Sequence, residues 1–297
     1  MCCALSGNRG VIEPPGCEGI IYRITNSIHR MDMRSHYNFD LEHLPERTSG
    51  DRDNGLTMVM DKGLSLKEVE HFIESSAPYA DLVKFGFGTA LLTTNLSDKV
   101  RLYQSAGLHP YFGGTLFEMF YIRDQFDGYR KFVEETGLEY VEVSDGTIRI
   151  DHDAKLECIE TLSRDYKVLS EVGSKVKGVE LSNAVWVSHM KQEMDAGAWK
   201  VIAEARESGT IGIYNPDGSA NKALISDIIK DVSVEDVVWE APHKSQQVLF
   251  IKLVGPNVNL GNISPSEVVA LEALRCGMRG DTFFDVLPPR FHSRSSS

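Results

Sequence analysis

One supersecondary pattern recurs eight times along most of this 297-residue chain. In each unit a short apolar or β-branched run ends in polar residues, and a segment with helical periodicity follows. Eight such units of roughly 30 residues predict an α/β fold, a single closed (β/α)8 TIM barrel. The predicted strands are 56–60, 81–86, 109–112, 140–143, a run that begins at Val168, 199–203, 237–239 and 258–260.

The segments between these strands predict the helices of the barrel. Ser65 and Glu68 have the spacing of a capping box at the start of the first helix. The predicted helices are 66–77, 97–106, a long one that runs to Thr136, 153–166, one that contains Trp186, 222–231, 245–253 and 265–275. An open doubly wound sheet is the alternative, but it calls for a glycine-rich loop after the first strand, and 61–64 (Asp-Lys-Gly-Leu) is not one.

The repeats define one catalytic domain, residues 39–285. We expect residues 1–38 to be a disordered extension, or the result of a start codon assigned too early, with Met31 or Met33 as alternative starts. Residues 286–297, rich in Ser and Arg, are expected to form a disordered tail.

Composition narrows the classes of function. A formal net charge of -12 argues against a nucleic-acid binder, which normally presents a basic surface. Five cysteines without zinc-site spacing suit reduced thiols in the cytoplasm. Because no apolar run approaches the length of a transmembrane helix, we expect no membrane partner.

Polar residues gather where the predicted strands end. In a barrel the carboxyl ends of all strands converge on one mouth, the usual place of the active site. The residues brought together there are Asp61, Lys62, Lys84, Glu142, Ser144, Asp145, Glu171, Lys175, Glu204, Arg206, Glu240, Lys244, Asn259 and Asn262. Crowded carboxylates need a cation, and an all-oxygen donor set suits Mg²⁺. Salt bridges around the rim are the alternative explanation.

The basic residues of this set predict the ligand. Lysines and an arginine at the mouth favour a small polyanion that bears phosphate, carboxylate or sulfur oxyanions. Glycines in the same loops, among them Gly209 and Gly261, let backbone N–H groups approach such a ligand closely.

With these residues assembled, the chain resembles the phosphosulfolactate synthase family from about Gly55 to Phe283. The similar segments are 55–63, 83–89, 113–118, 142–146, 171–173, 204–209, 240–242, 258–263 and 274–283. The resemblance implies a (β/α)8 barrel, Mg²⁺ dependence and a homo-oligomer. It also implies addition of sulfite to phosphoenolpyruvate to give (2R)-2-phospho-3-sulfolactate, a step best known from coenzyme M synthesis and compatible with other sulfonate pathways.

The resemblance also suggests a general acid. Lys175 falls at the position of the proposed acid of the family, two residues after Gly173. Some relatives carry two lysines there, whereas this chain has Ser174-Lys175 and keeps the second. Asp145 and Glu171 are the candidate catalytic carboxylates beside it.

The remaining roles are assigned from position at the mouth. Glu142, Glu171 and Glu204 are the expected Mg²⁺ ligands. The expected substrate-binding residues are Lys62, Lys84, Arg206, Gly209, Asn259, Gly261 and Asn262, with Arg206 and the Gly209 and Gly261 backbone as a phosphate clamp. Two alternatives stay open: another enolate-forming enzyme that uses phosphoenolpyruvate, and a non-catalytic stress-associated protein, since one fold serves many functions.

Overall fold

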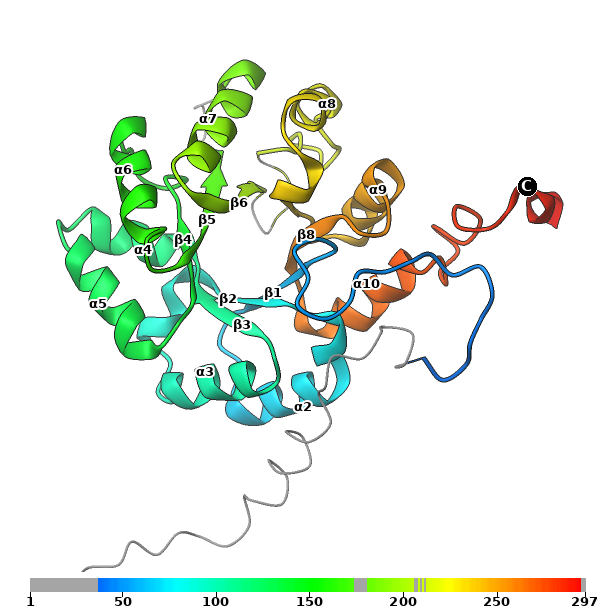
Figure 1. Cartoon of the computed structure of the whole chain (residues 1–297), viewed down its shortest axis with the longest axis horizontal. Helices are drawn as coiled ribbons and strands as arrows, with labels where there is room; N and C mark the ends of the chain where they lie inside the picture. Colours follow the sequence, from blue (N-terminus) through cyan, green and yellow to red (C-terminus); the bar gives the residue numbers. More distant parts are fainter. Residues whose placement is uncertain (1–36, 174–180, 206–207, 209, 211, 295–297) are drawn as a thin grey trace, which may run out of the picture.

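The computed structural model is a closed barrel of eight parallel strands, as the repeats predict (Figure 1). It describes residues 37–173, 181–205, 208, 210 and 212–294. The strands pair in chain order, and the eighth pairs with the first. They are β1 (Thr57–Asp61), β2 (Leu82–Phe85), β3 (His109–Phe112), β4 (Tyr140–Val143), β5 (Lys167–Val172), β6 (Ala198–Ala203), β7 (Val237–Glu240) and β8 (Asn259–Ile263).

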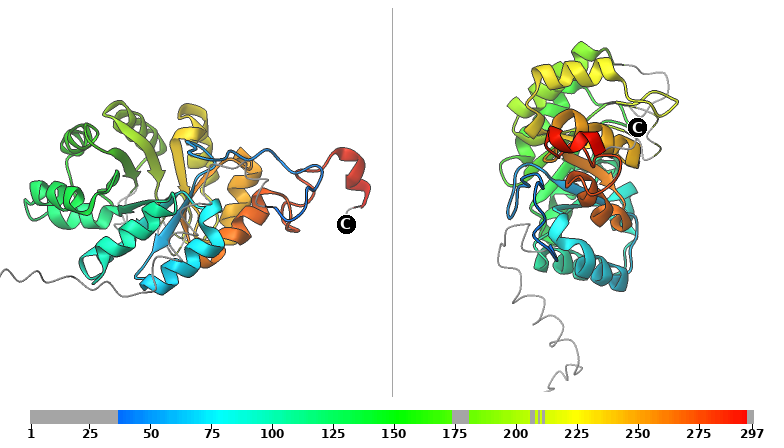
Figure 2. Two further views of the ribbon diagram at one scale, coloured as in Figure 1. Left: turned by 60° about the horizontal axis from the view of Figure 1, so that its bottom comes forward. Right: turned by 90° about the vertical axis from the view of Figure 1, so that its right-hand side faces the viewer.

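Helices surround the strands (Figure 2). The α-helices are α2 (Leu66–Ser76), α3 (Leu96–Ser105), α4 (Gly114–Tyr121), α5 (Phe126–Thr136), α6 (His152–Leu162), α7 (Asn183–Asp195), α8 (Lys222–Asp231), α9 (Lys244–Val254) and α10 (Val268–Arg275). Short 3-10 helices are η2 (Ala77–Tyr79), η3 (Gly86–Leu91), η4 (Val234–Asp236), η5 (Pro265–Glu267) and η6 (Pro289–Arg294). The capping box predicted at the start of α2 is confirmed, with Ser65 and Glu68 bonded to each other's backbone.

One predicted helix is two in the structure. The long helix expected to run to Thr136 ends as α4 at Tyr121 and restarts as α5 at Phe126. Between them Asp124 has a φ of 54°, a left-handed conformation that cannot continue an α-helix. The break frees α4 to point its N-terminus at the mouth of the barrel.

Alternate residues of each strand face the interior and the helices. Met58, Leu82, Tyr111, Leu169 and Val238 belong to an apolar cluster inside the barrel. A larger cluster packs the outward-facing strand residues against the helices. Toward the carboxyl ends of the strands the interior positions become charged, so the polar residues are concentrated at one end.

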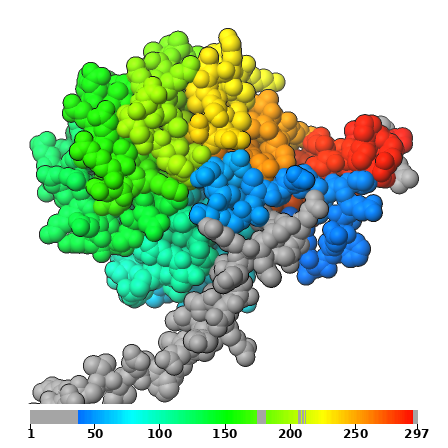
Figure 3. Space-filling view, viewed as in Figure 1, coloured from blue at the N-terminus to red at the C-terminus, as the bar shows by residue number. Residues whose placement is uncertain are grey.

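The N-terminal segment closes the opposite end of the barrel. Arg47 forms a two-pronged ion pair with Glu272, and Arg52 forms another with Asp81, which precedes β2. In Figure 3 this segment, in blue, lies beside the red C-terminal segment. Within the segment expected to form the tail, residues 289–294 form η6, and the Phe291 ring lies 5.5 Å from the ring of His43.

The structure describes only part of the chain, which limits what it says about the N-terminal extension and about membrane-spanning helices. Most of the predicted N-terminal extension, residues 1–36, lies outside the described residues. None of the helices that the structure describes combines the length and the apolar character needed to cross a membrane.

Candidate active site

Four glutamates and one lysine fill the interior at the carboxyl ends of the strands. None of these five side chains belongs to a residue more than 4% exposed. The five residues are Lys84 in β2, Glu142 in β4, Glu171 in β5, Glu204 directly after β6 and Glu240 in β7. A single ammonium group among four buried carboxyl groups leaves this set suited to a further cation.

Lys84 holds two of the glutamates. Its Nζ lies 3.1 Å from Glu142 Oε2 and 3.1 Å from Glu240 Oε1. Burial alone would lower the pKa of Lys84, but the two carboxylates outweigh it and raise the pKa well above the usual lysine value. The sequence predicted that Lys84 binds substrate. In the structure its ammonium already balances two carboxylates.

A glycine pair at the start of α4 lets the helix approach Glu142. The backbone N–H of Gly114 donates to Glu142 Oε1 over 2.6 Å, so the carboxylate lies at the positive end of the helix. A Cβ at Gly114 would collide with Ser144 Cβ and would lie 2.9 Å from Glu142 Oε1. The contact therefore depends on a residue without a side chain.

Three of the glutamates could share a metal ion. Carboxylate oxygens of Glu171, Glu204 and Glu240 lie within 4.8 Å of one another, and all three residues are buried. Glu240 is further oriented by the backbone N–H of Ala205, which donates to its Oε2 over 2.8 Å. The donor set is all oxygen, which fits Mg²⁺. The expected ligand set was Glu142, Glu171 and Glu204, whereas the geometry groups Glu240 with the last two.

Glu118 of α4 adds a fifth buried carboxyl group that the strand-end argument missed. Ser144 Oγ lies 2.8 Å from Glu118 Oε1 and 2.7 Å from Glu171 Oε1. A hydroxyl has one proton to donate, so both contacts are hydrogen bonds only if one carboxyl group is protonated. The backbone N–H of Thr147 also donates to Glu118 Oε1. The only sequence signal for Glu118 was its place at the end of the similar segment 113–118.

Lys155 of α6 joins Asp145 to the end of β5. Its Nζ lies 2.8 Å from Asp145 Oδ1 and donates to the carbonyl of Glu171 over 2.7 Å. The same atom lies 2.9 Å from Glu193 Oε1. Burial would lower the pKa of Lys155, but Glu193 and Asp145 raise it above the ordinary value. This lysine was missed because it lies on a helix and not at a strand end.

Asn262 and Gly261 lie near the mouth, in packed surroundings. Asn262 adopts a left-handed φ of 58° and its Nδ2 donates to the carbonyl of Ala205. A Cβ at Gly261 would lie 2.5 Å from Met58 Cε, so the glycine is needed for packing inside the barrel.

Asn259 lies at the wrong end of its strand for a substrate ligand. Its side chain accepts from the backbone N–H of Leu56 and donates to the carbonyls of Glu235 and Val237. These partners precede β1 and begin β7, so Asn259 joins strands at the amino end of the barrel. Lys62 is an exposed residue just after β1. Lys175, Arg206 and Gly209 lie outside the described residues.

The comparisons with known proteins assign the family. The sequence profile of (2R)-phospho-3-sulfolactate synthase (ComA) matches residues 45–281. The chain belongs to this family. It is 41% identical over 251 residues to the phosphosulfolactate synthase of Bacillus subtilis, covering 83% of this chain and 98% of that protein.

An archaeal relative is equally similar. The phosphosulfolactate synthase of Methanothermobacter thermautotrophicus is 41% identical over 244 residues, covering 80% of this chain and 95% of that protein. Among solved structures, 3-hexulose-6-phosphate synthase matches with a TM-score of 0.49 and 12% identity, over 73% of this chain and 97% of that one. The buried glutamates at the barrel mouth lie within the part of the chain that matches this family.

Proposed function

We propose that this protein is a Mg²⁺-dependent phosphosulfolactate synthase, a carbon–sulfur lyase that joins sulfite to phosphoenolpyruvate. The observation that carries the proposal is the buried group of Glu171, Glu204 and Glu240 at the barrel mouth, in a chain of this family. The product is (2R)-2-phospho-3-sulfolactate, a precursor for coenzyme M or for another sulfonate.

The reaction forms one bond and adds one proton. The sulfur lone pair of sulfite attacks the methylene carbon of phosphoenolpyruvate, and the π electrons move to the carbon that bears the phosphate. Negative charge is then delocalised into the substrate carboxylate as an enediolate. A proton delivered to that carbon on one face completes the product, and the phosphate ester stays intact.

The buried residues of the mouth supply the charge pattern for this chemistry. Glu171, Glu204 and Glu240 would hold Mg²⁺, which supplies Lewis-acid stabilisation of the negative charge on the substrate. Lys84 keeps Glu142 and Glu240 in place by ion pairs on both sides. Ser144 Oγ lies within hydrogen-bonding distance of both Glu171 and Glu118 and so fixes the position of the Glu171 carboxyl group.

Lys175 is the proposed general acid. It stands four positions after Glu171 in the sequence. Asp145, which lies beside the same strand end, is proposed to orient the acid. Arg206 with the Gly209 backbone is proposed to bind the phosphate, and Lys62 to attract sulfite.

The decisive experiment measures loss of phosphoenolpyruvate with and without sulfite in the presence of Mg²⁺. Phosphorus NMR should show a new phosphate ester and no release of inorganic phosphate. Lys175→Ala should abolish turnover while the thermal unfolding curve stays unchanged. Loss of phosphoenolpyruvate that does not depend on sulfite would point to a different nucleophile, and no loss at all would remove the enzyme proposal.

We further propose a reducing compartment and a homo-oligomer. Cys158 and Cys276 are buried free thiols, and burial raises the pKa of each to about 11, which suits a cytoplasmic protein. Two large apolar residues near each other in the sequence are exposed, Phe87 at 53% and Leu92 at 83%. A second copy of the chain would cover such apolar side chains. Light scattering on the wild type and on Leu92→Glu would test the assembly.

A further inference from the structure

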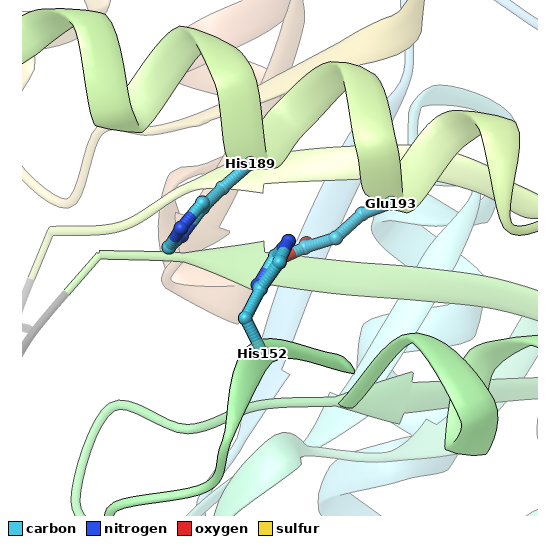
Figure 4. A group of neighbouring side chains, drawn as sticks. All are labelled: His152, His189 and Glu193. Atoms are coloured by element: carbon cyan, nitrogen blue, oxygen red, sulfur yellow. The ribbon is translucent and has the colours of Figure 1, made fainter. Parts of the chain in front are cut away.

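A second group of metal-ligating side chains lies outside the barrel, in the gap between α6 and α7 (Figure 4). It consists of His152, His189 and Glu193. Nothing in the proposed reaction uses these residues. Ligand atoms of the three lie within 4.8 Å of one another.

The two helices position the three side chains. His189 and Glu193 are four residues apart on α7, so they lie on the same face of that helix. His152 is the first residue of α6 and faces them across the gap, with its ring stacked on that of His189 at 3.8 Å between centroids. Its Nδ1 lies 4.0 Å from Glu193 Oε1.

The ring of His152 makes no hydrogen bond to the described residues. Both ring nitrogens are buried, and neither finds a hydrogen-bond partner among the described residues. Buried ring nitrogens without a partner are costly, and a ligand that accepts a lone pair would relieve that cost.

We propose that His152, His189 and Glu193 form a site for a divalent transition-metal ion of the zinc type. Two imidazole nitrogens and one carboxylate oxygen suit Zn²⁺, Co²⁺ or Ni²⁺ and are a poor match for Mg²⁺. Three protein ligands leave the fourth position of a tetrahedral ion for water. The site is separate from the acidic group at the mouth and takes a different class of metal.

Binding requires a small rearrangement. Tetrahedral bonds of about 2.1 Å place ligand atoms about 3.4 Å apart, so donors that now lie within 4.8 Å of one another must approach by at most about 1.4 Å, and the rings must unstack. Glu193 Oε2 is anchored by the hydroxyl of Ser170, which leaves Oε1 for the metal. Lys155, now near that oxygen, keeps Asp145 and the Glu171 carbonyl as its other partners.

The test is a Co²⁺ titration of the full chain with Mg²⁺ in large excess, followed by visible absorption. Tetrahedral Co²⁺ with nitrogen ligands absorbs far more strongly than octahedral Co²⁺ on oxygen. We expect one strongly absorbing Co²⁺ per chain, displaced by Zn²⁺. His152→Ala and His189→Ala should each weaken binding at least about 10-fold, and the double variant should lose the bands.

Two variants separate this site from other metal-binding positions. His71→Ala, an exposed histidine of α2, and Glu204→Gln in the mouth should both keep the bands. Absence of the bands in the wild type, or their persistence in the double variant, would overturn the proposal. So would their loss in Glu204→Gln. Because this readout does not involve turnover, a failed sulfite assay leaves the result interpretable.

Discussion

Each of the two metal-ligating groups in the described part of this protein brings three ligand atoms within 4.8 Å of one another, and the two groups differ in their donors. The inner group, Glu171, Glu204 and Glu240, stands on strand ends and is fully buried, and it offers only oxygen. The outer group stands on helices, is partly open to solvent, and offers two imidazoles and one carboxylate. This difference in donor chemistry and in access to solvent would assign Mg²⁺ to the inner group and a zinc-type ion to the outer one.

Each group has a buried lysine at its edge, and the two lysines are not equivalent. Lys84 lies among carboxylates that face the mouth. Lys155 lies between the groups, since it contacts Glu193 on one side and the Glu171 carbonyl on the other. The outer group therefore lies two contacts from a ligand of the inner group, through a single side chain.

Removing the inner lysine should have the largest effect. Lys84→Met leaves Glu142 and Glu240 buried without their shared cation, which should cost about 3–5 kcal/mol of stability. Turnover should fall by about 1000-fold or more, because the geometry of Glu240 depends on this pair. Urea unfolding and steady-state kinetics would measure the two effects.

Lys99→Met is the matched control for Lys84→Met. Lys99 is also buried and pairs with the carboxylate of Asp61 over 2.7 Å, but on the helix side of the barrel. We expect Lys99→Met to lose about as much stability as Lys84→Met. The Mg²⁺ concentration that gives half-maximal turnover should stay as in the wild type. If Lys84→Met and Lys99→Met lost similar stability and also lost turnover to the same extent, Lys84 would have no specific role in the site.

The second prediction decides which glutamates hold the inner metal. Glu240→Gln should raise the Mg²⁺ concentration for half-maximal turnover by about 100-fold, since it removes a ligand. Glu142→Gln should raise it by less than about 10-fold, because Glu142 bonds to Lys84 and Gly114 N–H and lies outside the triplet. The reverse ranking would restore Glu142 to the ligand set.

The sequence was sufficient to predict the barrel because the eight strand–helix units repeat the same change of polarity. It also predicted that Glu142, Glu171, Glu204 and Glu240 meet, since interior positions at strand ends face one another in any such barrel. It did not predict which three come closest, because that depends on strand stagger and on the ion pairs of Lys84. Neither appears in a linear pattern.

Errors in the predicted site have the same physical origin. Asn259 was placed at the mouth because the eighth strand was predicted to end at Leu260, whereas β8 extends to Ile263 and moves Asn259 to the amino end. Glu118 and Lys155 were missed because helical residues reach the mouth only through the tertiary fold. The outer group was missed for the same reason, since all three of its members lie on helices.

Lys155→Met tests the link between the two groups. We expect kcat to fall by about 10-fold with little change in KM for phosphoenolpyruvate, because the Glu171 strand end loses its support while the substrate contacts remain. Removal of the ammonium should also make Glu193 a better ligand, so Co²⁺ should bind the outer site about 10-fold more tightly. Unchanged Co²⁺ affinity would mean that Lys155 does not compete with the metal.

The smallest effect should come from the tight contact at the start of α4. In Gly114→Ala the new methyl group meets Ser144 and Glu142, so α4 must shift, at a cost of about 1–3 kcal/mol and a few-fold loss of turnover. Gly280→Ala is the control, since a Cβ there meets no atom within 4 Å. Thermal unfolding should show a change below about 0.5 kcal/mol for the control. If Gly114→Ala lost no more stability than Gly280→Ala, the close contact between α4 and Glu142 would not constrain the inner site.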